Sequence, residues 1–108
     1  VYQPHRYSRT LELFDQFVDV LSQVDYLVLL ETYAAGEDRI EGATGADLYK
    51  QLGLKTDAQV EFVVTIDEVP EALEQMLEPG DLLMTQGAGE TAKLARTLTE
   101  RWEGRRVR

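Results

Sequence analysis

Three short apolar segments alternate with segments of helical periodicity, and this alternation limits the folds open to the chain. The apolar segments are DYLVLLETY at 25–33, VEFVVT at 60–65 and DLLMTQ at 81–86. The first is a nearly continuous apolar run, which is typical of a strand buried on both faces in a parallel sheet. We therefore predict parallel strands over 24–30, 60–65 and 81–86.

The segment before the first predicted strand has apolar residues at steps of three and four, the spacing that lines one face of an α-helix. It predicts one amphipathic helix over 10–24, capped by Ser8 or Thr10. The segment 34–45 holds three glycines without an apolar period and is predicted to be a long loop.

Three further helices are predicted after this loop. The first begins at Thr44 and stops at Gly53. The second covers 67–77, with Pro70 in its first turn. The third begins near Glu90 and has one apolar side, formed by Leu94, Ala95, Leu98 and Trp102.

The unbroken alternation of strand and helix predicts a single α/β domain over 1–108, a Rossmann-like three-layer sandwich with a mostly parallel sheet and right-handed crossovers. Val1–Gln3 would be the end of a strand that feeds the first helix, about three residues where five or six are typical. We therefore expect the domain to be truncated at its N-terminal strand. The exposed sheet edge could pair with a second copy of the chain, giving a homo-oligomer.

Composition excludes several classes of protein. The net charge of −9 argues against nucleic acid as a partner, because phosphates are neutralised by a surplus of Lys and Arg. The longest apolar run, at 27–30, is far shorter than the roughly 20 residues of a membrane helix. The chain has no cysteine, so a disulfide or a thiolate metal site is excluded, and we expect no metal site. Without a signal-peptide pattern, the expected location is the cytoplasm.

Ligands of open α/β sheets bind outside the carboxyl ends of the strands, so the segments that follow the strands are the candidate sites. They are PHRYSRT, ETYAAGE, TIDEVP and QGAGET, of which TIDEVP has the pattern of an ordinary helix start. In QGAGET, Gly87 and Gly89 resemble the opening of the dinucleotide fingerprint GxGxxG, but the third position is Ala92. We therefore favour a tight strand-to-helix turn that faces a cleft over a dinucleotide site.

PHRYSRT contains the only histidine, His5, together with Arg6 and Arg9 at a predicted helix start. Guanidinium groups bind carboxylate or phosphate in a bidentate manner, and the imidazole of His5 could donate to the same anion. From the residues alone, two interpretations stand equally: an anion-binding site, and a pair of surface arginines balanced by the many carboxylates of the chain.

Three motifs in this order, VYQPHRYSRT, ETYAAGEDRIEGA and GDLLMTQGAG, resemble the carboxyl-terminal domain of the Mur ligase family, in particular its UDP-N-acetylmuramate:L-alanine ligases. The resemblance covers nearly the whole chain. It implies a Rossmann-like domain of an ATP-dependent ligase that adds L-alanine to UDP-N-acetylmuramate in bacterial peptidoglycan synthesis. ATP and Mg²⁺ would be bound mainly by another domain, and this segment alone would be inactive.

The resemblance also implies roles for individual residues. His5, Arg6 and Arg9 would bind the carboxylate of L-alanine and neighbouring charge, and no catalytic residue is expected in this segment. The loops that carry Tyr33, Gly36, Gly87 and Gly89 are candidate ligand-facing loops.

The chain departs from the family pattern at three points. It has no phosphate-binding GxxxxGK[ST] motif, it lacks the acidic and histidine-rich segment ahead of PHRYSRT, and Glu90-Thr91-Ala92 follows GAG. The alternative functions are those of the sister ligase that attaches a recycled tripeptide and of a non-catalytic acidic α/β binding module.

Overall fold

Two parallel strands form the centre of the computed structural model, which describes residues 1–87 and 90–103. Strand β1 (Tyr26–Leu30) pairs with β2 (Gln59–Val63) in the register that sets Tyr26 opposite Gln59 and Leu30 opposite Val63. Helix α3 (Gly45–Lys55) lies between them in the chain and makes the crossover. The two predicted strands and their parallel direction are confirmed.

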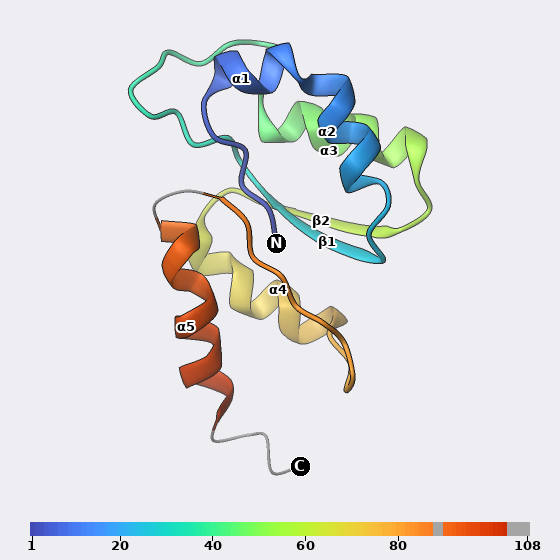
Figure 1. Cartoon of the computed structure of the whole chain (residues 1–108), viewed down its shortest axis with the longest axis vertical. Coiled ribbons are helices and arrows are strands. Elements are labelled where there is room, and N and C mark those ends of the chain that lie inside the picture. The colour runs from blue at the N-terminus through green and yellow to red at the C-terminus, as the bar shows by residue number, and fades with distance from the viewer. Residues whose placement is uncertain (88–89, 104–108) are drawn as a thin grey trace.

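Helices cover both faces of this sheet (Figure 1). On one face lie α1 (Tyr7–Glu12), α2 (Phe14–Leu21) and α3. On the other lie α4 (Val69–Met76), which follows a 3₁₀ turn over Ile66–Glu68, and α5 (Glu90–Glu103). The structure is therefore a small α/β fold built on a parallel pair of strands.

Strand β1 supplies both apolar cores, because successive side chains of a strand point to opposite faces. Leu27 and Leu29 belong to the core shared with α2 and α3, whose other buried members are Val18, Leu21, Leu48 and Leu52. Val28 and Leu30 belong to the core shared with α4 and α5, whose other buried members are Val63, Val69, Leu73, Met76, Leu94 and Leu98.

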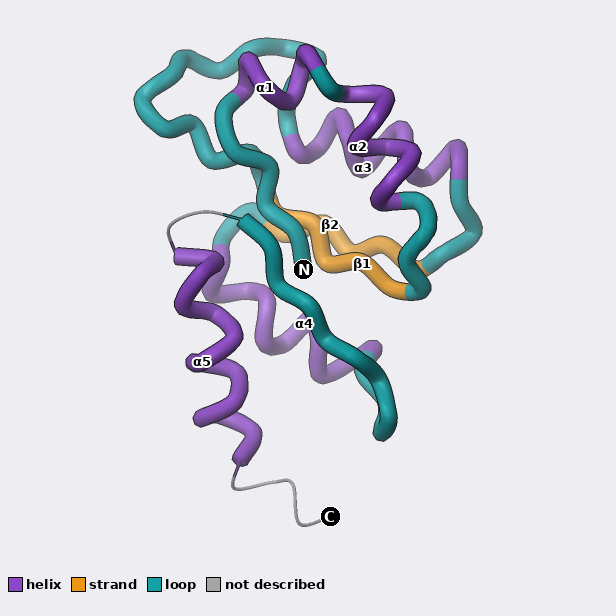
Figure 2. Tube along the Cα trace, viewed as in Figure 1, coloured by secondary structure: helices purple, strands orange, loops and turns teal. Residues whose placement is uncertain are grey.

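The third predicted strand, 81–86, is not formed as a strand (Figure 2). Tyr2 makes isolated parallel bridges to Leu29 and to Gln86, so the first residues of the chain lie between β1 and the end of this segment. The backbone hydrogen bonds between Val1–Gln3 and this segment involve only Met84 and Gln86 among the described residues. Among the described residues, no strand forms backbone hydrogen bonds with Leu82 or Leu83. The predicted third strand is therefore wrong, because a strand forms only beside another strand.

The single helix predicted over 10–24 is wrong, because the structure divides it into α1 and α2 at Leu13, whose φ of −109° and ψ of 20° are not helical. The apolar spacing continues across this point without Gly or Pro, so the pattern holds no signal for the break. The predicted cap is also wrong. Arg6 precedes α1 without a side-chain cap bond, and the Thr10 hydroxyl donates to the Arg6 carbonyl from inside the helix.

The other helices follow the prediction more closely. Thr44 caps α3 in a capping box with Asp47, as predicted, but the helix runs past Gly53 to Lys55. The hydrogen bonds from Thr44, first from its hydroxyl and then from its N–H, lower the pKa of Asp47. Pro70 lies in the first turn of α4, also as predicted.

Helix α5 begins at Glu90 and buries Leu94 and Leu98 as predicted, whereas Ala95 is exposed. No helix within residues 1–87 and 90–103 has the length and apolar character needed to cross a bilayer.

Gly45 allows α3 to begin directly against the end of β1. A Cβ atom at this position would lie 2.5 Å from the Leu30 carbonyl oxygen and 2.7 Å from the Glu31 Cα. Both atoms belong to the backbone, so no side-chain rotation would relieve the overlap. The crossover helix therefore depends on the absence of a side chain at its first position.

We predict that Gly45→Ala destabilises the protein by about 1 to 3 kcal/mol, because the new methyl group overpacks the contact between α3 and β1. Gly53→Ala is the matched control in the same helix, since a Cβ there meets nothing within 4 Å. It should stabilise by about 0.5 to 1 kcal/mol, the helix preference of Ala over Gly. Urea unfolding followed by circular dichroism measures both, and equal effects of the two variants would contradict the assigned contact.

Candidate functional site

The PHRYSRT and ETYAAGE segments lie side by side at the carboxyl ends of the central strands. The Tyr33 N–H donates to the Pro4 carbonyl at 2.8 Å, and the Arg6 N–H donates to the Tyr33 carbonyl at 2.8 Å. These bonds form an isolated parallel bridge between His5 and Tyr33. Two segments far apart in the sequence are thereby joined in one strand-end site, which we define as His5, Arg6, Arg9, Tyr33 and Glu37.

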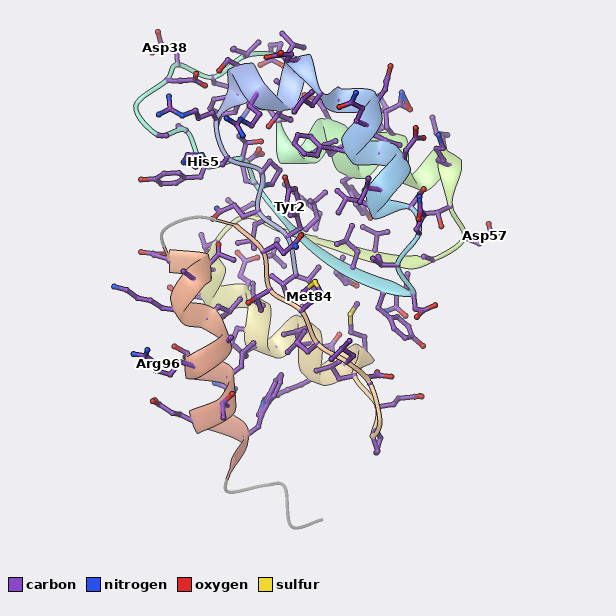
Figure 3. All side chains as sticks on the ribbon, viewed as in Figure 1. Tyr2, His5, Asp38, Asp57, Met84 and Arg96 are labelled. Atoms are coloured by element: carbon purple, nitrogen blue, oxygen red, sulfur yellow. The ribbon has the colours of Figure 1, made fainter. Side chains whose placement is uncertain are left out.

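The rings of His5 and Tyr33 stack at this bridge. Their centroids are 5.5 Å apart and their planes differ by 11°. The Tyr33 side chain is 49% exposed, so the stack lies at the surface, where Figure 3 labels His5 beside the loop 31–44. Tyr33 thus orients the imidazole of His5. The sequence analysis placed Tyr33 in a candidate ligand-facing loop and did not predict this stack.

Glu37 binds the amino end of α1 from the same loop. Its carboxylate accepts the Ser8 N–H at 3.0 Å and the Ser8 hydroxyl at 2.5 Å. The hydroxyl bond is the largest cause that lowers the pKa of Glu37, followed by the Ser8 N–H, and the charge of Arg6 contributes in the same direction. A carboxylate of the chain itself therefore lies at the start of α1.

Arg6 and Arg9 act on different neighbours. Arg6 has a positive φ of 73°, unusual for a residue with a side chain, and its charge acts on Glu37. The charge of Arg9 acts on Tyr2, where it opposes the burial that raises the pKa of the phenol. Both side chains are exposed, and neither forms an ion pair within the part of the chain that the structure describes.

Gly36 forms the turn that returns Glu37 to Ser8. Its φ of 87° lies in the left-handed region that favours glycine, and the Glu37 N–H donates to the Ala34 carbonyl at 3.0 Å. A Cβ at Gly36 would meet nothing within 4 Å. The turn therefore favours glycine because of its positive φ, and not because a side chain would overlap a neighbour.

Gly87 lies close to the start of α5. Its φ is 150°, and a Cβ there would lie 3.0 Å from the Thr91 side chain. Gly89, the other predicted glycine of this loop, lies outside the described residues. The structure thus gives Gly87 a packing role against α5.

The sequence analysis missed a series of hydrogen bonds that connects the segments at the strand ends. The buried Thr91 hydroxyl donates to Oε1 of Gln3 at 2.9 Å, and Nε2 of Gln3 donates to the Glu31 carbonyl at 3.2 Å. The Glu31 carboxylate accepts the N–H groups of Thr32 and Gly45 at 2.8 and 2.5 Å. No local motif marks these residues, because each partner comes from a different element.

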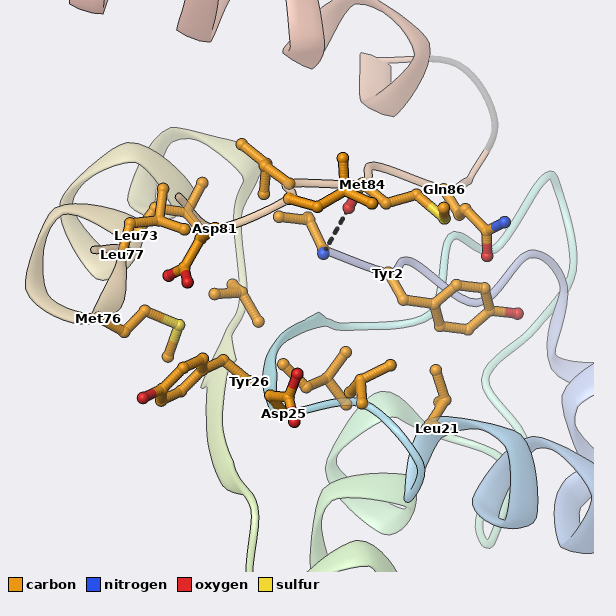
Figure 4. A pocket seen from close by; sticks show the side chains of 16 residues that line it. Tyr2, Leu21, Asp25, Tyr26, Leu73, Met76, Leu77, Asp81, Met84 and Gln86 are labelled. Carbon is orange, nitrogen blue, oxygen red and sulfur yellow. Dashed lines mark hydrogen bonds between the residues drawn. The ribbon is translucent and has the colours of Figure 1, made fainter. Parts of the chain in front are cut away.

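The guanidinium of Arg6 and the stacked imidazole of His5 suit a carboxylate or phosphate, and the guanidinium of Arg9 is also exposed on α1, but among the described residues no contact joins Arg9 to His5, Tyr33 or Glu37. Across residues 1–87 and 90–103, no group of three or more His, Cys, Asp or Glu side chains could hold a metal ion. A cavity of about 600 Å³ lies elsewhere, at the amino end of β1, and none of the strand-end residues lines it (Figure 4). A search of known protein-family models finds no match to this chain.

We predict that Glu37 titrates below its ordinary pKa of 4.5 and that Ser8→Ala raises its pKa toward that value, since the variant removes the strongest hydrogen bond. Because the pKa of Glu37 is lowered in the folded state, its ionised carboxylate stabilises the folded protein at pH values above the ordinary pKa. The contribution is lost as the pH falls through the lowered value. Carboxyl titration by NMR measures the shift.

Ser22→Ala is the control for this titration, because the Ser22 hydroxyl donates to the Asp19 carbonyl and not to the loop. It should leave the Glu37 titration unchanged. A Glu37 pKa at the ordinary value in the unsubstituted protein would contradict the contact with α1.

Proposed function

We propose that this chain is the carboxyl-terminal, Rossmann-like domain of a UDP-N-acetylmuramate:L-alanine ligase of the bacterial cytoplasm. The observation that carries the proposal is the contact between PHRYSRT and ETYAAGE, the two segments that most resemble that family. In an open α/β sheet this is the edge at which ligands bind. The three-layer arrangement is part of the proposal, and the helices on both faces of the parallel pair support it.

Arg9 is the residue to which we assign the carboxylate of L-alanine. Its side chain is exposed and forms no ion pair among the described residues, so its guanidinium is free to donate two hydrogen bonds to one carboxylate. The charge of Arg6 is partly balanced by Glu37, which makes Arg6 the weaker contributor. His5, held against Tyr33, would add a hydrogen-bond donor.

Holding the carboxylate would orient the amine of L-alanine toward the activated acyl group, and such positioning is a large part of the catalysis of amide formation. The residues of this chain do not fit a site for ATP and Mg²⁺. The sequence has no GxxxxGK[ST] motif, and the described residues hold no cluster of metal ligands. We assign the nucleotide and the sugar substrate to other parts of the ligase.

A second candidate function is that of a non-catalytic acidic α/β binding module in which the arginines are structural. The contact between Glu37 and Ser8 favours it, because the chain itself supplies a carboxylate near Arg6. The tripeptide-recycling ligase is a third, and its substrate also presents an amine to the same sugar nucleotide. Kinetics of Arg9 variants distinguish the module from both ligases.

In a ligase that contains this chain, Arg9→Ala should raise the Michaelis constant for L-alanine roughly tenfold to a hundredfold, which corresponds to loss of a charge-assisted contact of about 1.5 to 3 kcal/mol. The Michaelis constant for ATP should change much less. Arg9→Lys should recover only part of the loss, because an ammonium lacks the planar fork of the guanidinium.

Arg96→Ala, on an exposed position of α5, is the matched control and should leave both constants unchanged. The thermal midpoint of each variant should stay close to that of the parent, since the side chain of Arg9 is exposed. An unchanged alanine constant together with a lowered midpoint would make Arg9 structural and favour the binding module.

The purified 108-residue chain should show no alanine-dependent hydrolysis of ATP in the presence of UDP-N-acetylmuramate. The expectation follows from the missing phosphate-binding motif. Release of phosphate above the level of a protein-free control would refute the assignment of ATP to another domain.

A further inference from the structure

The imidazole of His5 is held in position without the use of its nitrogen atoms. Its ring stacks on the ring of Tyr33, with centroids 5.5 Å apart and planes that differ by 11°. Neither ring nitrogen forms a hydrogen bond or an ion pair within residues 1–87 and 90–103. The nitrogen atoms of an imidazole bind partners in the plane of the ring, so a neighbour on the ring face leaves them accessible.

The backbone around His5 is fixed as well. The Tyr33 N–H donates to the Pro4 carbonyl, and the Tyr33 carbonyl accepts the Arg6 N–H, each at 2.8 Å. These two bonds enclose His5, and the partners of a strand bridge turn their side chains to the same face. Pro4 is buried, and its ring fixes φ directly ahead of His5. The backbone therefore sets the two aromatic side chains beside each other.

The side chain of Tyr33 contributes little to the packing of the fold. It is 49% exposed, and it belongs to neither apolar core. Its hydroxyl forms no hydrogen bond among the described residues. The contact that the structure gives this side chain is the stack on His5, and that contact is made by the ring.

We propose that Tyr33 is a positioning residue for His5, whose imidazole it holds in the orientation that donates a hydrogen bond to the carboxylate of L-alanine. The inference rests on the proposed function, and it assigns to Tyr33 an effect on the substrate that passes through His5. A free imidazole would lose side-chain freedom when the substrate binds. A stacked imidazole has already lost most of that freedom, so the substrate binds more tightly.

The first test is kinetic and uses a ligase that contains this chain. Tyr33→Ala should raise the Michaelis constant for L-alanine about two- to tenfold, the range expected when one more side chain must be ordered on binding. The turnover number should change less, because the bound complex keeps the same hydrogen bond. The Michaelis constant for ATP should stay close to that of the parent.

Two further variants at the same position separate the ring from its hydroxyl and from its apolar bulk. Tyr33→Phe keeps the ring and should restore the alanine constant of the parent. Tyr33→Leu is apolar but cannot stack, and it should behave like Tyr33→Ala. The proposal is wrong if Tyr33→Leu restores the constant as well as Tyr33→Phe does, since apolar bulk would then be sufficient.

Tyr49→Ala is the matched control. Tyr49 lies on α3, is 43% exposed and stacks on Phe62 with ring centroids 5.8 Å apart. The variant thus removes an exposed, stacked tyrosine ring outside the strand-end site, and it should leave the alanine constant unchanged. Equal rises with Tyr49→Ala and Tyr33→Ala would overturn the proposal, because loss of any stacked ring would then have the same effect.

A double-mutant cycle with His5→Ala tests whether Tyr33 acts through the imidazole. In a ligase that already carries His5→Ala, Tyr33→Ala should have no further effect on the alanine constant. A further rise as large as that of the single variant would overturn the proposal, because Tyr33 would then contact the substrate directly or support the fold. An alanine constant that Tyr33→Ala alone leaves unchanged would overturn it too.

Arg9→Ala separates this inference from the proposed function. If Arg9→Ala raises the alanine constant and Tyr33→Ala does not, the function stands and the role of Tyr33 is wrong. If Arg9→Ala, His5→Ala and Tyr33→Ala all leave it unchanged, both proposals are wrong. The stack itself is checked in the 108-residue chain by NMR, where nuclear Overhauser contacts between the two rings are expected. Their absence would overturn the role of Tyr33 alone.

Discussion

Burial of β1 on both faces is the constraint on which the rest of the structure depends. Residues Leu27 to Leu30 are almost inaccessible to solvent, and they alternate between a core with α2 and α3 and a core with α4 and α5. Removal of this apolar surface from water favours helices on both sides of one short strand. Gly45 then allows the crossover helix to start against the backbone of the same strand.

Carboxylates of the chain itself occupy the amino ends of two helices. Glu37 binds Ser8 at the start of α1, and Glu31 with Asp47 binds the first residues of α3. Such contacts satisfy N–H groups that lack helical partners and complement the helix dipole. Exposed guanidinium groups, rather than free helix ends, are consequently the positively charged groups of the strand-end site.

The two regions of interest lie at opposite ends of β1 and have different physical characters. The strand-end site, after the carboxyl end, is polar and exposed, with Arg9 free of ion pairs among the described residues. The cavity at the amino end of β1 is lined mostly by apolar side chains, among them Leu27, Leu73 and Met76. The exposed guanidinium groups of the first have the chemistry of an anion site, whereas the second offers mainly apolar surface.

Local pattern was enough to predict much of the fold. The continuous apolar run of β1, the Thr44 cap with Asp47 and the position of Pro70 in α4 depend on neighbours in sequence, and the structure has all three. The break at Leu13 was not predictable, because the apolar spacing continues through it without Gly or Pro. The third strand was predicted wrongly, because a strand forms only where a neighbouring strand pairs with it. The same holds within the site. The sequence by itself determined which residue types follow each strand, whereas tertiary structure alone decided that His5 stacks on Tyr33 and that Glu37 reaches Ser8, because each contact joins segments separated by 28 or 29 positions and carries no local signal.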